Sequence, residues 1–287
     1  MEITAQLVKE LREKTGAGMM DCKKALAETQ GNLETAVALL REKGIAKAAS
    51  KEGRTTSEGI IIAHIDQANH LGVLVEINCE TDFVARTDKF KDFARDVSWH
   101  AAESKSSDVD ALLAEKMKSG KTVTEFVKET IGALGENMQI KRFVRFSGDG
   151  YITSYIHPGD KLGVLVEVAV GKSADGKESF RLFARDIAMQ VAATSPKCVR
   201  RDELDQTLIA AEKEIYRHQA LNEGKPEKIV DKIADGKLDK WYSEVVLTEQ
   251  LFVKDNDKTI NDLVKQQSAA IGEPVNIKRF ARFRLGE

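Results

Sequence analysis

The stretch with the most recognisable chemical spacing in this chain runs from Gly171 to Glu178 and reads "GKSADGKE". Its Gly-x-x-x-x-Gly-Lys pattern lies between an expected strand and an expected helix, as in loops that wrap the phosphates of a nucleotide. Such a loop next requires Ser or Thr to hold Mg²⁺, whereas this chain has Glu178, whose carboxylate would repel phosphates. The sequence therefore favours a plain turn over a nucleotide site.

The five histidines and three cysteines form no familiar ligand or catalytic pattern. The sequence contains no His-Glu-x-x-His motif and no Cys-x-x-Cys pair, and no Ser/His/Asp arrangement is evident from spacing, although triads assemble in space. The cysteines, Cys22, Cys79 and Cys198, are odd in number and far apart, which indicates buried thiols in a reducing compartment rather than disulfides. An enzyme is thus the weaker interpretation.

Composition excludes further classes. The 287 residues include 42% hydrophobic residues, enough for two or three units with their own cores. Because 44 basic residues face 46 acidic ones, no global positive field is available to hold a nucleic-acid backbone. The N-terminus has no apolar signal segment and no run reaches the length of a membrane span, so we expect a cytoplasmic protein.

The elements that must position any site are organised by a duplication. Residues 59–77, "GIIIAHIDQANHLGVLVEI", align with residues 150–168, "GYITSYIHPGDKLGVLVEV", and each predicts a hairpin of two strands. Farther along, "DFARDVSWHAA" matches "LFARDIAMQVAA", and "GENMQIKRFVRF" matches "GEPVNIKRFARF". Each copy is therefore expected to be strand, strand, helix, helix, strand. Two matching helical faces are predicted to be buried: Phe90, Phe93 and Val97, and Phe180, Phe183 and Ile187.

The two "KRF" strands interleave basic and aromatic residues, which is also a feature of sheets that stack RNA bases. They lack the glycine of the RNA-recognition signature, and both end a duplicated unit. Structural strands with charged outer faces are favoured, and RNA binding stays an alternative.

An insertion distinguishes the second copy, because the offset between the copies grows from 90 to 137 positions. Leu204, Leu208, Ala211 and Ile215 step at helical spacing, "NEGKPEK" supplies a stop and a restart, and Ile229, Ile233 and Trp241 follow. We expect an antiparallel helical hairpin that projects from the second copy, since a shared apolar seam can stabilise two helices. A helix pair lying flat on the core is the alternative.

Ahead of the duplication, the sequence predicts a small bundle of three helices. Leu7, Val8 and Leu11 share one helical face, "MMDCKKALAET" forms a second helix, and Asn32 caps a third that ends at Gly44. The polar stretch that follows is expected to be a linker.

The two copies differ most in "CETDFVART", residues 79–87. Loops are normally polar, so Phe83 and Val84 either turn into the core or remain exposed to contact a partner. The second copy has no apolar pair in the same interval, and a unit that folds without the pair suggests that it faces outward. Core packing stays open, because related units can repack.

These segments resemble a known family. "VKELREKTGAGMMDCKKAL", residues 8–26, and "INCETDFVAR", residues 77–86, are similar to the two signature segments of bacterial elongation factor Ts, and the resemblance extends over essentially the whole chain. It implies an α+β fold: a UBA-like three-helix bundle at 1–45, a linker at 46–58, core subdomains at 59–147 and 148–287, and a coiled-coil hairpin at about 203–256.

The resemblance also implies a function. Members bind elongation factor Tu with GDP, disturb its Mg²⁺ and phosphate site, and promote GDP release during translation elongation, with no catalytic chemistry or cofactor of their own. Thr81, Asp82, Phe83 and Val84 match the residues that dislocate the Mg²⁺, with Phe83 as a wedge and Asp82 as the electrostatic disturbance. Lys23 and His157 match further contacts with elongation factor Tu. Neither a membrane nor direct contact with nucleic acid is expected.

Overall fold

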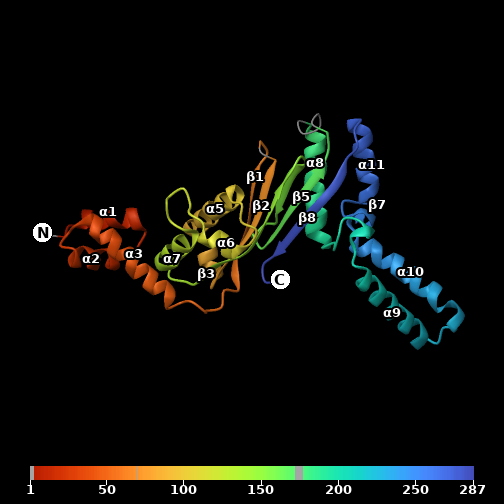
Figure 1. The fold of residues 1–287 in the computed structure, drawn as a ribbon, viewed down its shortest axis with the longest axis horizontal. Coiled ribbons are helices and arrows are strands. Elements are labelled where there is room, and N and C mark those ends of the chain that lie inside the picture. The colour runs from red at the N-terminus through yellow and green to blue at the C-terminus, as the bar shows by residue number, and fades with distance from the viewer. Residues whose placement is uncertain (1–2, 69, 172–176) are drawn as a thin grey trace.

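The computed structural model describes residues 3–68, 70–171 and 177–287. It is an elongated α+β structure in which two antiparallel sheets lie between helical regions at either end (Figure 1). The N-terminal helices are α1 (Ala5–Thr15), α2 (Met19–Glu28) and α3 (Leu33–Ala49). They share a small core that contains Val8 and Leu11, with Leu7 partly buried beside it, as the helical spacing predicts, and that also contains Leu26.

The structure confirms the duplicated order of strands. The first sheet contains β1 (Glu58–Asp66), β2 (Leu71–Cys79) and β3 (Met138–Ser147), and the second contains β4 (Tyr151–Ile156), β5 (Leu162–Ala169) and β8 (Asn276–Arg284). Each central strand has a register shift at the equivalent place, just after Glu76 in β2 and just after Glu167 in β5. The copies therefore share the irregularity of their strand pairing as well as its order.

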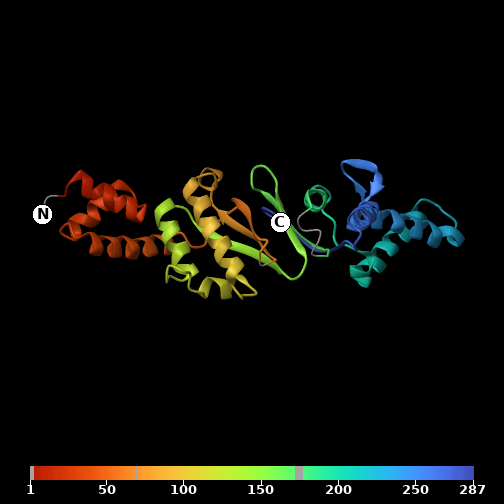
Figure 2. The same cartoon turned by 90° about the horizontal axis from the view of Figure 1, so that it is seen from above.

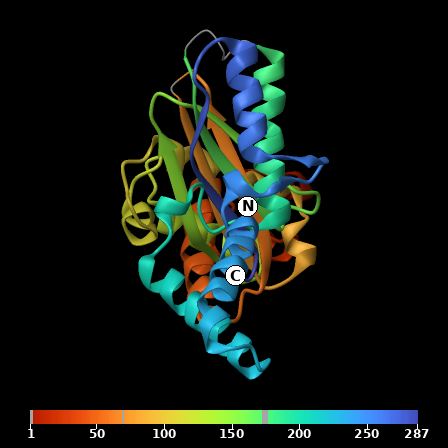
Figure 3. The ribbon, with the colours of Figure 1, turned by 90° about the vertical axis from the view of Figure 1, so that its right-hand side faces the viewer.

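Helices cover one face of each sheet. The first copy has α4 (Asp82–Ala85), α5 (Asp88–Glu103), α6 (Val109–Ala114) and α7 (Val123–Leu134), and the second has α8 (Glu178–Thr194) and α11 (Ile260–Ile271). Figure 3 shows α8 and α11 side by side in front of the second sheet. The predicted helical faces are confirmed, because Phe90, Phe93, Phe180 and Phe183 are all buried.

The opposite faces of the two sheets pack against each other. Leu74 and Leu165 share one buried cluster between the sheets, whereas their neighbours Val73 and Val164 belong to the clusters under the helices. Side chains on both faces of each central strand are therefore buried, which explains the continuous apolar run "LGVLVE" in place of a polar alternation. Gly72 is required there, because a Cβ on it would lie 2.5 Å from Ile152 Cγ2.

The basic and aromatic residues of the two "KRF" strands meet across this sheet-to-sheet interface. The guanidinium of Arg142 lies 4.4 Å from the ring centroid of Phe283, and that of Arg279 lies 4.3 Å from the ring centroid of Phe146. The structural interpretation of these strands is thus correct for these four side chains, which contact each other within the molecule.

The end of α3 differs from the prediction. Gly44 does not stop the helix, which continues to Ala49 and brings Ala48 into the core of the first copy. Gly44 lies where α3 crosses α7: a Cβ built on Gly132 of α7 would be 2.7 Å from the Cα of Gly44. The glycine permits close packing of two helices rather than termination.

The insertion forms two packed helices, α9 (Gln206–Asn222) and α10 (Glu227–Val245), which project away from the sheets (Figures 1 and 2). Leu204 and Trp241 are buried as predicted, but Ala211, Ile215 and Ile229 are exposed, so their assignment to the seam is wrong. Leu208 does lie in the seam, and Ile209 and Tyr216 of α9 join it there. The remaining short elements are η1 (Arg201–Glu203), η2 (Leu247–Glu249), β6 (Leu251–Phe252) and β7 (Asp255–Thr259).

Candidate protein-binding site

Residues 82–85, expected to be loop, form the single helical turn α4 between β2 and α5. Thr81 is its N-cap, since the hydroxyl oxygen Oγ1 accepts a hydrogen bond from the backbone N of Val84 at 3.4 Å. A Ser or Thr cap at the start of a short turn supplies an acceptor that the backbone lacks. The turn is therefore an ordered element attached to the sheet.

The apolar pair is split by this turn. Phe83 is 82% exposed, whereas Val84 is partly buried and packs on the core of the first copy. Consecutive residues of a helix point about 100° apart, so one can face solvent while the next faces the core. The prediction of an outward pair is correct for Phe83 and wrong for Val84.

The same turn carries an ion pair. Asp82 and Arg86 form an ion pair at 2.8 Å, with Arg86 78% exposed. An exposed pair of this kind contributes little to stability and exchanges partners easily. Its carboxylate is available to a partner at small energetic cost.

Cys79 lies under the same turn and is not a reactive nucleophile. Its Sγ donates to the carbonyl oxygen of Thr81 at 3.2 Å, and burial, with the nearby charge of Glu136, raises the pKa of this thiol to about 12. Burial likewise raises the pKa of Cys198, to about 11. Since the thiolate is the reactive form, both side chains act as small buried groups, as the sequence predicts.

The remaining sequence-predicted contacts lie on other elements. Lys23 is exposed on α2, the helix that also exposes Met19 and Met20, while His157 is exposed in the turn between β4 and β5. The Nδ1 atom of His157 lies 3.0 Å from the hydroxyl of Tyr155. The predicted contact residues therefore lie on three separate elements: α2, the turn between β4 and β5, and α4 with its cap, Thr81.

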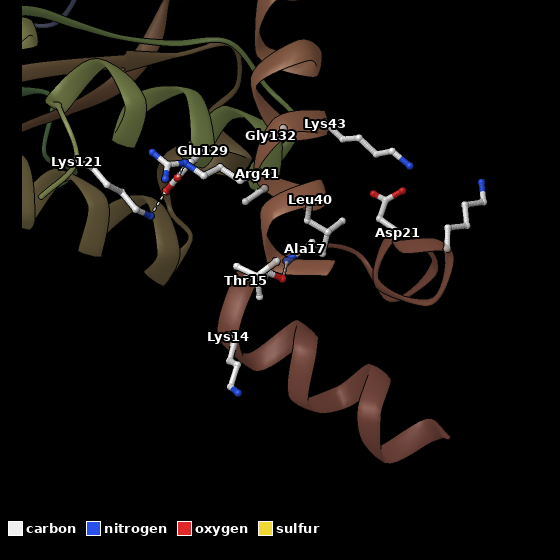
Figure 4. A pocket seen from close by; sticks show the side chains of 14 residues that line it. Lys14, Thr15, Ala17, Asp21, Leu40, Arg41, Lys43, Lys121, Glu129 and Gly132 are labelled. Carbon is white, nitrogen blue, oxygen red and sulfur yellow. Dashed lines mark hydrogen bonds and ion pairs between the residues drawn. The ribbon is translucent and has the colours of Figure 1, made fainter. Parts of the chain in front are cut away.

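Figure 4 shows a pocket between the α1–α2 turn, α3 and α7. Four of the five cations that line it pair with glutamates: Arg41 contacts Glu129 at 2.8 Å, and Lys121 contacts the same carboxylate at 2.5 Å. Lys14 and Lys43 also pair with glutamates at 2.9 and 2.7 Å. Because these four charges are already neutralised and Asp21 adds a carboxylate to the lining, the pocket is poorly suited to a phosphate group.

Two further observations concern only residues 3–68, 70–171 and 177–287. Within them, no group of three or more His, Cys, Asp or Glu side chains could hold a metal ion, and no helix is long and apolar enough to cross a membrane. Most of "GKSADGKE" lies outside the described residues, so the preference for a plain turn there stays a prediction.

Sequence reasoning missed Glu136. Its carboxylate accepts hydrogen bonds from the backbone N and the hydroxyl of Thr81, at 3.0 and 2.6 Å, although the two residues are 55 positions apart. The available signal was the Gly-Glu pair at 135–136, which recurs at 272–273 in the aligned segment of the second copy.

An ordered turn that holds one aromatic side chain in solvent, on a scaffold made of two matched sheets, offers the kind of anchor that protein-binding proteins use at their interfaces. The profile of the family described as Elongation factor TS matches residues 80–287. The chain is also 49% identical over 286 residues to proteins named Elongation factor Ts from Clostridium botulinum (strain Alaska E43 / Type E3) and Clostridium perfringens (strain SM101 / Type A), covering 99% of this chain and 93% of each relative. The chain belongs to the elongation factor Ts family. Membership implies nucleotide exchange on elongation factor Tu in translation elongation.

Proposed function

We propose that this chain binds elongation factor Tu in its GDP form and inserts Phe83 beside the nucleotide site, where it disturbs the Mg²⁺ and phosphate contacts and promotes GDP release. The observation that carries the proposal is the 82% exposure of Phe83 on an ordered turn, because a preformed aromatic anchor can fill a partner's pocket with little loss of entropy.

The physics of exchange requires no catalytic group in this chain. Bound Mg²⁺ supplies much of the charge that holds the phosphates of GDP in a GTPase. An exchange protein that prefers the nucleotide-free GTPase lowers the affinity of the GTPase for GDP. By thermodynamic linkage, GDP lowers the affinity of the GTPase for the exchange protein by the same ratio. Asp82 adds a carboxylate close to the wedge, while Thr81 and Val84 fix the turn that carries it.

Two other surfaces belong to the proposal as separate grips on elongation factor Tu. Lys23 contributes a positive charge beside the exposed Met19 and Met20, and His157 contributes an imidazole in a tight turn. The proposal further treats residues 1–45 as a UBA-like bundle and residues 203–256 as a coiled-coil hairpin. It implies a cytoplasmic location.

The test is stopped-flow release of fluorescent GDP from elongation factor Tu, chased with excess unlabelled GDP. Wild-type chain is expected to accelerate release, and Phe83→Ala to reduce the acceleration by about tenfold or more, as for an interfacial hot spot. Leu182→Ala is a matched control, because Leu182 is 54% exposed on α8 and lies outside the proposed contact. No acceleration by wild-type chain, or equal effects of the two variants with unchanged melting, would exclude the proposal.

A further inference from the structure

Two glutamates connect α4 to the end of the first sheet by a reciprocal exchange. Glu136 accepts from the backbone N of Thr81 at 3.0 Å, and Glu80 accepts from the backbone N of Asn137 at 2.6 Å. A second oxygen of Glu136 accepts from the hydroxyl of Thr81 at 2.6 Å. We call Glu80 and Glu136, with these three hydrogen bonds, the carboxylate clasp.

The clasp begins where the backbone pairing of β2 and β3 ends. Cys79 and Met138 are the last paired residues of these antiparallel strands. The next two positions outward are Glu80 opposite Asn137 and Thr81 opposite Glu136. The backbone of β2 must turn away into α4 here, and carboxylate oxygens replace the carbonyl groups that a longer strand would supply.

The clasp determines the direction in which α4 leaves the sheet. It holds the N-cap residue Thr81 by both its backbone N and its hydroxyl, and that hydroxyl in turn accepts from Val84 N. Hydrogen bonds to charged acceptors are about twice as strong as neutral ones. These bonds hold the backbone at both ends of the segment that carries Phe83.

We propose that Glu136, supported by Glu80, is a positioning residue that pre-organises Phe83 for insertion into the partner. This inference rests on the proposed function, which makes Phe83 the wedge. Without the clasp, α4 would have to be ordered during binding, and that entropy would be subtracted from the free energy that drives GDP release.

The second copy supplies an internal control. Glu273 is the counterpart of Glu136, and its carboxylate occupies the space that a side chain on Gly171 would need. Gly171 aligns with Glu80, and the described chain around it carries no exposed aromatic residue between Val170 and Phe180. Both copies thus have a glutamate at this position, but only in the first copy does it bind a turn that carries an exposed aromatic residue, Phe83.

The experiment combines two readouts on Glu136→Gln, Glu273→Gln, Phe83→Ala and the double variant Glu136→Gln/Phe83→Ala. Glutamine keeps the size of the side chain but replaces one acceptor oxygen by a donor. Hydrogen exchange of the Thr81 and Val84 amides measures the clasp, and stimulated GDP release measures positioning. We expect Glu136→Gln to speed amide exchange and to slow GDP release by about 3- to 10-fold, and Glu273→Gln to change neither.

The double variant separates positioning from general structure. If Glu136 acts through Phe83, the substitution at 136 adds nothing once Phe83 is alanine, whereas a merely structural effect would persist. Unchanged amide exchange in Glu136→Gln would overturn the clasp, and faster amide exchange with normal GDP release would overturn positioning.

Failure of the proposed function gives a different result. Wild-type chain would then not accelerate release, or Phe83→Ala would not impair it, and Glu136 would have nothing to position even if amide exchange showed the clasp. Should Glu136→Gln fold poorly, Thr81→Val removes the hydroxyl that donates to Glu136 and also accepts from Val84 N, and it must reproduce the slower release.

Discussion

Phe83 and Val84 are neighbours on one helical turn, but their surroundings give them different tasks. The ring of Phe83 is in solvent, while Val84 packs on the core that contains Ala85 and Phe90. Sequence comparison of the two copies located this turn, because only the first has an apolar pair. It could not show that Phe83 is exposed while Val84 is partly buried. That difference depends on a single helical turn whose cap, Thr81, is bound by a glutamate 55 positions away.

At the residue scale, this division predicts effects of different size on stability. Val84→Ala removes partly buried methyl groups and is expected to lower the free energy of unfolding by about 1 to 2 kcal/mol. Phe83→Ala should change it by less than about 0.5 kcal/mol, since the ring is exposed. Urea unfolding followed by circular dichroism measures both, and an equal loss for the two variants would mean that the ring of Phe83 is buried in solution.

At the scale of elements, the sequence predicted strands better than helix ends. The duplicated strands share register because the same apolar run must be buried on both faces in each copy. Gly44 misled the prediction of α3 because a glycine that ends a helix and one that permits a helix crossing look alike in sequence. The seam of α9 was misplaced for a related reason: which neighbours face α10 depends on how the two helices are rotated.

The crossing of α3 and α7 gives a prediction for glycine variants. Gly132→Ala should destabilise the protein by about 1 to 3 kcal/mol, because the new Cβ would lie 2.7 Å from the Cα of Gly44. Gly236 lies inside α10, where an added Cβ would meet no atom within 4 Å. Gly236→Ala should therefore stabilise the protein by about 0.5 to 1 kcal/mol. Urea unfolding of both variants tests this, and stabilisation by Gly132→Ala would show that α3 and α7 do not cross closely.

At the scale of the whole molecule, two arginines join the copies. Arg142 pairs with the buried Glu76 of its own sheet at 2.7 Å and donates to the carbonyl oxygen of Arg284 in the other sheet at 3.1 Å. Arg279 repeats this with Glu167 at 2.6 Å and the carbonyl oxygen of Ser147 at 3.1 Å. The repeat was visible in sequence as "IKRFVRF" and "IKRFARF", but its role required the two strands to be seen facing each other.

The two arginines are expected to contribute differently to stability, because the glutamate that each one pairs with has a different second partner. Glu167 is also bound by Lys278 at 2.8 Å, whereas the second partner of Glu76 is the neutral amide of Asn78, at 3.3 Å. Burial alone would raise the pKa of Glu167, but hydrogen bonds from Lys278 and Arg279 outweigh it and hold that pKa below its usual value.

Arg142→Ala would leave the carboxylate of Glu76 buried without a cation, so a loss of about 3 to 5 kcal/mol is expected. Arg279→Ala should cost roughly half as much, since Lys278 remains beside Glu167. Urea unfolding gives both values, and adding Glu76→Gln to Arg142→Ala should recover part of the loss because it removes the unpaired charge. Equal losses for the two arginine variants would mean that Lys278 does not neutralise Glu167, and that the two halves of the interface are equivalent in energy as well as in sequence.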